Sequence, residues 1–163
     1  MTDTKLSAFI NKNGLSQDYV TTVERYFLPI AEDIYKHQCG AKGPIVVGIN
    51  GAQGSGKSTL ADLIVLLLRD KFKLNSVALS LDDFYHTKAE RQQLSKTIHP
   101  LLITRGVPGT HDVSLAIKTI DDLKKQRGGV AIPRFSKAID DRLPEHQWDI
   151  TQSLMLLFLK VGV

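Results

Sequence analysis

One short segment constrains this chain more than any other, the glycine-rich stretch Gly51-Ala52-Gln53-Gly54-Ser55-Gly56-Lys57-Ser58. It matches the pattern G-x-x-x-x-G-K-S/T at every fixed position. The β-branched run at 44–49 before it predicts a buried strand, and the apolar run at 57–70 after it predicts a buried helix. Backbone N–H groups gather around a phosphate in a strand–loop–helix of this kind. The segment therefore predicts an α/β fold built around a phosphate-binding loop.

The residue types of this loop suit ATP and Mg²⁺. Glycines let the backbone wrap the phosphates closely, where larger side chains would collide. The Lys57 ammonium is expected on the β- and γ-phosphates, and the Ser58 hydroxyl is expected to bind Mg²⁺. The alternative is a flexible turn that binds nothing. The expected ATP-binding residues are Gly51, Ala52, Gln53, Gly54, Ser55, Gly56, Lys57, Ser58 and Thr59.

The remaining pattern alternates strands with helices. Strands are predicted at 76–81 and 130–132, and helical stretches at 87–95 and 113–126. This alternation favours a three-layer P-loop fold with a mostly parallel sheet. Ser16 is the expected N-cap of an earlier helix at 17–37, which Pro29 should kink or split. We expect a single domain over 1–163, with a helical segment at 1–40 and a nucleotide-binding core at 44–163.

Composition and charge limit the class of protein, its partners and its location. The 163 residues are 42% hydrophobic and 23% charged, as in ordinary globular chains. The net charge of +4 suits an anionic small-molecule substrate, and we expect no nucleic-acid or membrane partner. Cys39 is the only cysteine, which excludes an internal disulfide and a cysteine-based metal site. No signal peptide or membrane-spanning run is recognised, so a cytoplasmic location is expected; the oligomeric state is not indicated.

Guanine-nucleotide switches are not favoured. Their Asn-Lys-x-Asp motif does not follow the loop, and the single Asn-Lys pair, Asn11-Lys12, lies upstream of it. No Asp-x-x-Gly follows the loop either. The chain therefore fits an ATP-binding protein better than a GTPase.

Two adjacent carboxylates follow the strand predicted at 76–81. Asp82 and Asp83 are expected at the edge of the sheet where ligands bind in open α/β folds. A carboxylate there can accept the proton of an attacking hydroxyl. Alternatively, either aspartate turns the chain or caps the next helix.

The segment Ser80-Leu81-Asp82-Asp83-Phe84-Tyr85 behind this loop resembles the group of uridine kinases, phosphoribulokinases and pantothenate kinases. Residues 105–112 and 133–142 look most like the D-glycerate 3-kinase branch, and the resemblance runs from about 20 to 154. It implies an ATP-dependent kinase that phosphorylates a hydroxyl of a small molecule, with a D-glycerate-like acid as the first candidate substrate. Lys57 and Asp82 are the implied catalytic residues. The implied substrate-binding residues are Tyr85, Arg105, His111, Asp112, Arg134, Lys137 and Arg142.

Structural roles compete with these assignments. Asp112 could cap the helix that follows it, and Tyr85 could be a core residue. Arg134, Lys137 and Arg142 form either a clamp for an anionic substrate or a run of charges paired with neighbouring aspartates. Asp83 is interpreted as a helix cap.

The resemblance also implies a longer chain. Relatives carry an acidic Glu-Gly segment after an apolar strand, whereas the run at 155–163 has Lys160 in that place. The fold is therefore expected to be incomplete at its C-terminus. The alternative function is a non-catalytic or inactive ATP-binding protein. One hypothesis is that 155–163 is an out-of-frame translation of the family strand, and the alternative is a naturally short protein.

Overall fold

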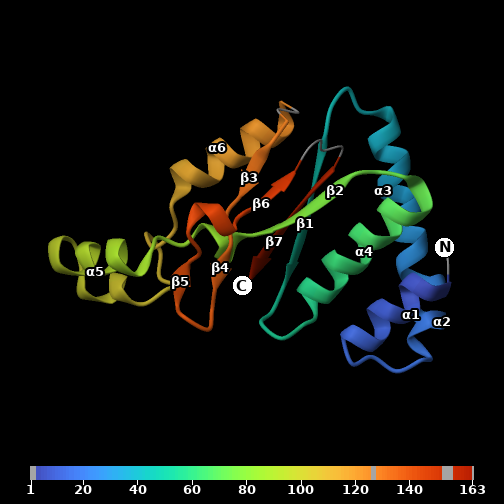
Figure 1. Ribbon diagram of the computed structural model, residues 1–163, viewed down its shortest axis with the longest axis horizontal. Helices are drawn as coiled ribbons and strands as arrows, with labels where there is room; N and C mark the ends of the chain where they lie inside the picture. Colours follow the sequence, from blue (N-terminus) through green and yellow to red (C-terminus); the bar gives the residue numbers. More distant parts are fainter. Residues whose placement is uncertain (1–2, 126–127, 152–155, 163) are drawn as a thin grey trace. The chain divides into compact units, whose positions relative to one another are not determined.

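A computed structural model describes residues 3–125 and 128–151 and the backbone of 156–162 (Figure 1). The chain forms two compact units, Met1–Ala78 with Leu154–Val163, and Leu79–Ser153. The model agrees with the α/β class expected from the sequence.

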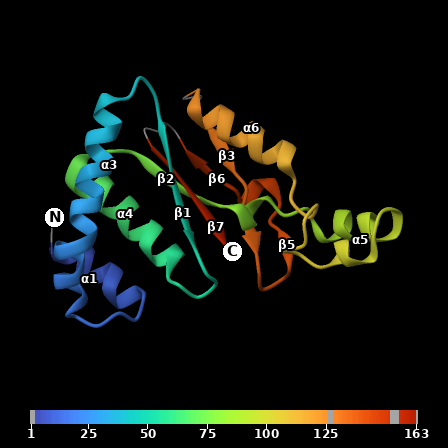
Figure 2. The ribbon, with the colours of Figure 1, turned by 180° about the vertical axis from the view of Figure 1, so that it is seen from behind.

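The first unit is mainly helical. Its helices are α1 (Asp3–Lys12), α2 (Tyr19–Thr22), α3 (Leu28–Gly40) and α4 (Lys57–Phe72), and its strands are β1 (Ile45–Gly51), the start of β2 (Ser76–Ser80) and β7 (Leu156–Gly162). Helices α3 and α4 pack together, as both opposite views show (Figures 1 and 2). Helix α1 lies within the helical segment expected at 1–40.

Pro29 divides the predicted N-terminal helix. A π-helical turn, Val23–Phe27, immediately precedes α3, and the backbone N–H of Leu28 donates to the carbonyl of Val23. Pro29 lies in the first turn of α3, where its missing N–H costs least. The predicted start was wrong, because α2 begins at Tyr19 and Ser16 contributes only a backbone carbonyl, which accepts from the Tyr19 N–H.

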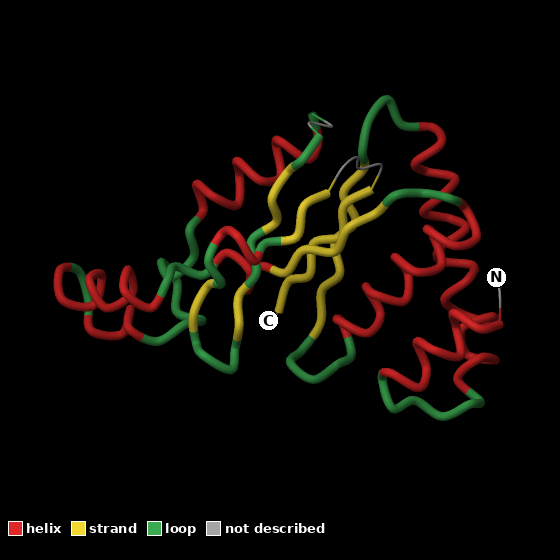
Figure 3. Tube along the Cα trace, in the orientation of Figure 1, coloured by secondary structure: helices red, strands yellow, loops and turns green. Residues whose placement is uncertain are grey.

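Three strands form one sheet in the order β1, β7, β2 (Figure 3). Strands β1 and β7 are parallel, with Ile45 opposite Leu156 and Gly51 opposite Gly162. The apolar run at 155–163 forms a strand over 156–162, and Met155 and Val163 lie outside the described residues. The two other ladders, both in the second unit, are antiparallel: β3 (Val130–Ile132) with β6 (Asp149–Thr151), and β4 (Phe135–Ser136) with β5 (Asp141–Arg142).

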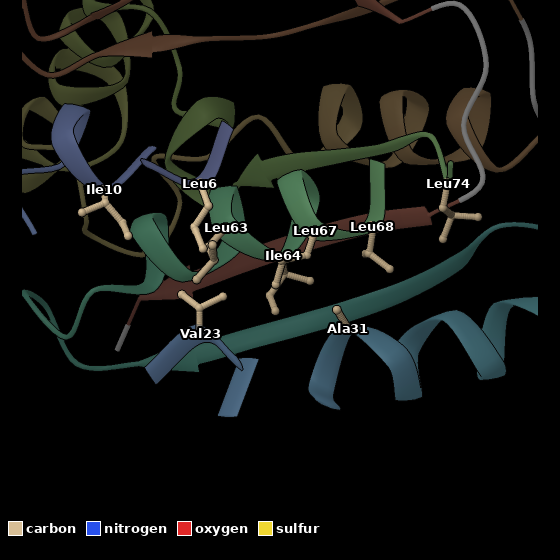
Figure 4. Close-up of a cluster of buried hydrophobic side chains, with 9 residues drawn as sticks. All are labelled: Leu6, Ile10, Val23, Ala31, Leu63, Ile64, Leu67, Leu68 and Leu74. Atoms are coloured by element: carbon tan, nitrogen blue, oxygen red, sulfur yellow. The ribbon is translucent and has the colours of Figure 1, made fainter. Parts of the chain in front are cut away.

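The core of the first unit forms around α4. The side chains of Leu63, Ile64, Leu67 and Leu68 are buried, and Val23 faces them from the π-helical turn (Figure 4). The cluster is completed by Leu6, Ile10, Ala31 and Leu74. Burial of this apolar face fixes α4, and with it the end of the loop that precedes α4.

The second unit joins short elements through many polar contacts. It contains α5 (Lys88–Thr97), α6 (Val113–Lys124) and 3-10 turns at Leu81–Phe84, Pro100–Ile103 and Glu145–Gln147. The helical stretch predicted at 87–95 corresponds to α5. Thr87 is the N-cap of this helix and forms a capping box with Glu90. Across the described ranges, every helix is too short or too polar to span a lipid bilayer.

Candidate functional site

The glycine-rich loop connects β1 to α4, as the sequence predicts. Gly54 and Gly56 have φ values of +78° and +81°, which side chains rarely tolerate. A Cβ added to Gly51 would lie 2.9 Å from the Ser55 Oγ. Gly54 and Gly56 therefore favour glycine because of their backbone conformation, and a side chain at Gly51 would require the Ser55 hydroxyl to move.

Lys57 folds over this loop. Its Nζ donates to the carbonyl oxygens of Gly51 and Ala52, at 2.6 Å in each case. Gly56 is the N-cap of α4, and no side chain in the described part of the chain caps that helix end. An ammonium group and a positive helix end thus lie at the same short loop, which is exposed to solvent from Ala52 to Gly56. This combination suits a polyphosphate.

A bound Mg²⁺ would need the phosphates of the nucleotide as ligands. Among the described residues no group of three or more His, Cys, Asp and Glu side chains could hold a metal ion. Ser58 is exposed in the first turn of α4, where its hydroxyl can serve as one oxygen ligand. The remaining ligands of Mg²⁺ would then be phosphate oxygens and water, which is usual for this ion.

In the second unit, the two adjacent aspartates have different environments. The buried Asp83 accepts from the backbone N–H of Ser80 (2.9 Å) and Phe135 (3.2 Å) and from Arg134 Nη1 (3.2 Å). Its predicted role as a helix cap is confirmed. Asp82 is partly exposed, and its Oδ2 lies 2.8 Å from Lys137 Nζ. Of these two aspartates, Asp82 is therefore the one whose carboxylate a ligand can reach.

An aromatic pair lies beside Asp82. Tyr85 is 7% exposed, and its ring stacks on that of His111 with centroids 4.2 Å apart. Burial raises the pKa of Tyr85, and the charge and hydrogen bond of Asp82 raise it further. Burial lowers the pKa of His111; Asp82 opposes this shift and His86 adds to it. The His111 Nε2 is buried, and no residue in the described part of the chain forms a hydrogen bond with it. Tyr85 is thus a core residue, and its predicted substrate contact stays a prediction.

The predicted cationic residues are paired with carboxylates inside the same unit. Lys137 pairs with Asp82, as given above. The remaining pairs are Arg105 with Asp140, Arg134 with Asp83 and Asp149, and Arg142 with Asp112 and Glu90. The structure therefore agrees with the alternative in which these charges pair with carboxylates of the same unit. Anion binding by these residues remains a prediction, because a bound acid would have to replace a carboxylate partner.

Asp112 uses both carboxylate oxygens within the unit. Oδ1 accepts from the backbone N–H of Leu115 at 2.9 Å, which confirms Asp112 as the N-cap of α6. Oδ2 accepts from Arg142 Nη1 at 3.2 Å. A direct contact of Asp112 with substrate stays a prediction.

The sequence interpretation missed the residues that hold the unit together. Arg91 is 1% exposed, although it lies on the very polar helix α5, and it bonds to Asp140 Oδ2 at 3.0 Å. The two residues are 49 positions apart. No local pattern marks them.

A strand, a glycine-rich loop carrying Lys57 and Ser58, and a buried helix define the P-loop class of nucleotide-binding folds. No family model matches the chain. It is 41% identical over 112 residues to the uncharacterized kinase mug58 of Schizosaccharomyces pombe, covering 64% of this chain and 40% of that protein. It is 31% identical over 128 residues to the chloroplastic D-glycerate 3-kinase of Arabidopsis thaliana, covering 73% and 28%.

The solved D-glycerate 3-kinase of Cryptococcus neoformans has the same fold over this region. Its TM-score is 0.68 at 26% identity, with 82% of this chain and 50% of that chain covered. Pantothenate kinases and a uridine-cytidine kinase are also similar in sequence. The chain belongs to this group of P-loop kinases, and it spans half or less of the length of these relatives.

Proposed function

We propose that this chain is an ATP-dependent kinase that phosphorylates a hydroxyl of a small anionic metabolite, most like D-glycerate. The observation that carries the proposal is the phosphate loop, in which Gly54 and Gly56 have positive φ values and Lys57 Nζ lies at the loop carbonyls. Its relatives are named as kinases, which supports phosphoryl transfer over other P-loop chemistry. A cytoplasmic location and the absence of nucleic-acid and membrane partners stay predictions.

On this proposal, the loop binds the ATP phosphates. The backbone of Gly51–Lys57 and the N-terminal end of α4 hold them, and Lys57 leaves its carbonyl partners to stabilise the charge on the β- and γ-oxygens. Ser58 would hold Mg²⁺, which neutralises charge as the γ-phosphate transfers. The Thr59 side chain follows at the next position of the helix.

Asp82 would act as the general base. Its carboxylate accepts the proton of the acceptor hydroxyl while a bond forms from the hydroxyl oxygen to the γ-phosphorus. The bond from that phosphorus to the β–γ bridging oxygen breaks, and ADP is the leaving group. Lys137, which already contacts Asp82, would bind a carboxylate of the same acceptor.

The acceptor assignment rests on charge and on relatives. Cationic side chains of Arg105, Arg134, Lys137 and Arg142 gather in the unit that contains Asp82 and favour an acid over a neutral nucleoside. Two relatives are named D-glycerate 3-kinases. Pantothenate is also a hydroxy acid, and pantothenate kinases are among the relatives, so it is the main competitor.

A second candidate is an ATP-binding chain that does not transfer phosphate. Lys160 is in register with Ile49, close to the end of β1 where the phosphate loop begins. The resemblance implies an acidic residue near this position, and the lysine that this sequence has instead cannot supply an oxygen ligand for Mg²⁺.

ATP turnover separates the two candidates. ADP formation would be measured with D-glycerate, L-glycerate, pantothenate, uridine and cytidine, and Lys57→Ala serves as the control for background activity. Turnover with D-glycerate supports the proposal. Binding of ATP without turnover on any acceptor supports the second candidate, and failure to bind ATP contradicts both.

A further inference from the structure

Arg91 is a buried cation that needs a reason to be there. It lies on α5, and its guanidinium donates to the carbonyls of His86 (3.3 Å) and Ile103 (2.9 Å) and to the carbonyl and carboxylate of Asp140 (2.6 and 3.0 Å). A buried charge is costly unless it is paired and hydrogen-bonded. Arg91 meets that condition by joining a helix, a loop and a hairpin turn.

Asp140 receives a second guanidinium. Arg105 pairs with Asp140 Oδ1, while Arg91 holds Oδ2. Both guanidinium groups also lie over the ring of Phe135, 5.9 and 5.8 Å from its centroid. Asp140 has a φ of +53°, a conformation that non-glycine residues adopt rarely. The two arginines therefore hold a turn whose backbone is otherwise unfavourable.

This turn belongs to the hairpin that carries two cationic residues of the candidate site. Strands β4 and β5 pair at only two positions, Phe135 with Arg142 and Ser136 with Asp141. A hairpin this short is not stable by itself. Lys137 leaves β4 to reach Asp82, and Arg142 on β5 donates to the carbonyl of Tyr85 at 3.4 Å.

We propose that Arg91 and Arg105 act through Asp140 as positioning residues, which fix the hairpin so that Lys137 faces Asp82. The effect on catalysis rests on the proposed kinase function, whereas the placement of Lys137 does not. In this arrangement both guanidinium groups pair with the single carboxylate of Asp140. Their role is to hold the ammonium of Lys137 where an acceptor would meet the base.

The amine reactivity of Lys137 tests the placement directly. The folded protein would be treated with a trace of acetic anhydride, and the acetylation of each lysine measured by mass spectrometry. An ammonium held by a carboxylate reacts more slowly than a free one. Asp82→Asn should therefore raise the reactivity of Lys137, by about two- to fivefold for an ion pair this exposed. Asparagine and glycine both tolerate a positive φ, so Asp140→Asn and Asp140→Gly should keep the turn. Each variant should raise the reactivity of Lys137 by a similar factor.

Controls separate positioning from general loosening. Asp122→Asn should raise the reactivity of its partner Lys118, 3.2 Å away, and leave Lys137 unchanged. If the Asp140 variants do not fold, Arg105→Gln, at a partly exposed side chain, provides the second route to the same measurement. Circular dichroism would verify the fold of each variant.

Two results would overturn the proposal. One is unchanged Lys137 reactivity in folded Asp140 or Arg105 variants while Asp82→Asn raises it. The other is no change in Asp82→Asn itself, because the pair would then be absent in solution. If the chain has kinase activity, Asp140→Asn should also lower kcat without changing the KM for ATP. A wild-type chain without activity, but with the expected reactivity changes, contradicts only the kinase function.

Discussion

Lys137 Nζ lies 2.8 Å from Asp82 Oδ2, and both side chains are partly exposed, at 65% and 37%. An ion pair this exposed contributes little stability. We therefore expect this pair to matter for binding of the acceptor and not for stability. An acidic acceptor that binds Lys137 replaces Asp82 as the partner of the ammonium, and it brings its own hydroxyl close to the carboxylate that would take the proton.

Asp82→Asn should lower kcat by roughly 10²- to 10⁴-fold, the usual contribution of a general base. Asparagine keeps the size of the side chain but cannot accept the hydroxyl proton. The affinity for ATP should stay within about twofold, since Asp82 has no role in holding ATP on this proposal. Steady-state kinetics and calorimetric titration with ATP would measure the two quantities.

Asp83→Asn is the matched control, one residue away. Asp83 accepts three hydrogen bonds inside the unit and should matter for folding. Its loss should lower the free energy of unfolding by about 1–3 kcal/mol, the cost of disturbing hydrogen bonds to a buried charged group. Urea titration would measure this. Unchanged turnover in Asp82→Asn, or a larger kinetic loss in Asp83→Asn, would remove Asp82 from the catalytic role.

Lys57→Ala should weaken ATP binding by about 10- to 100-fold, because a charge-assisted contact contributes roughly 1.5–3 kcal/mol. Within the described part of the chain this ammonium donates to two carbonyl oxygens, so little stability should be lost with it. Lys12→Ala, at the end of α1, is the control for net charge. Equal affinities of Lys57→Ala and wild type for ATP would contradict the assignment of the phosphate loop.

Two glycines of β1 provide a sharper test of the loop geometry. A Cβ at Gly51 would approach the Ser55 Oγ to 2.9 Å, whereas one at Gly48 meets nothing within 4 Å. Gly51→Ala should therefore reduce ATP affinity by displacing Ser55, and Gly48→Ala should leave it unchanged. Calorimetric titrations of both variants measure this difference. Similar affinities in the two variants would show that the approach of Ser55 to Gly51 is not part of the binding loop.

The features that the sequence predicts well are local ones. The phosphate loop and the cap formed by Asp83 depend on residues within a few positions of one another, so their patterns are readable along the chain. Helix α1, within the helical segment expected at 1–40, also has a readable pattern in its buried Leu6 and Ile10, four positions apart. Its type follows from the same periodicity that predicted the later helices.

The contacts that build the second unit could not be predicted in this way. Arg91 lies in a helix with a polar pattern, and it is buried because Asp140, on a distant hairpin, offers it a carboxylate and a carbonyl. The charge run around Lys137 likewise permits either a clamp or internal pairing. Which one forms depends on folded geometry, since surface charges carry no period that identifies their partners.

Acid should destabilise the wild-type chain in part through His111. Burial lowers the pKa of His111 in the folded state, His86 lowers it further and Asp82 opposes both, while the pKa in the unfolded chain is near 6.5. Below pH 6.5 the unfolded state therefore binds more protons, and stability falls as pH drops from 6.5 through the folded pKa.

His111→Phe keeps an aromatic ring against Tyr85 and removes the titration. The difference in unfolding free energy between pH 7.5 and pH 5.5, measured by urea titration, should be smaller in this variant than in wild type. The exposed His37→Gln serves as the control and should retain the wild-type difference. An equal pH dependence in His111→Phe and wild type would mean that the unpartnered Nε2 of His111 is hydrated and not buried in solution.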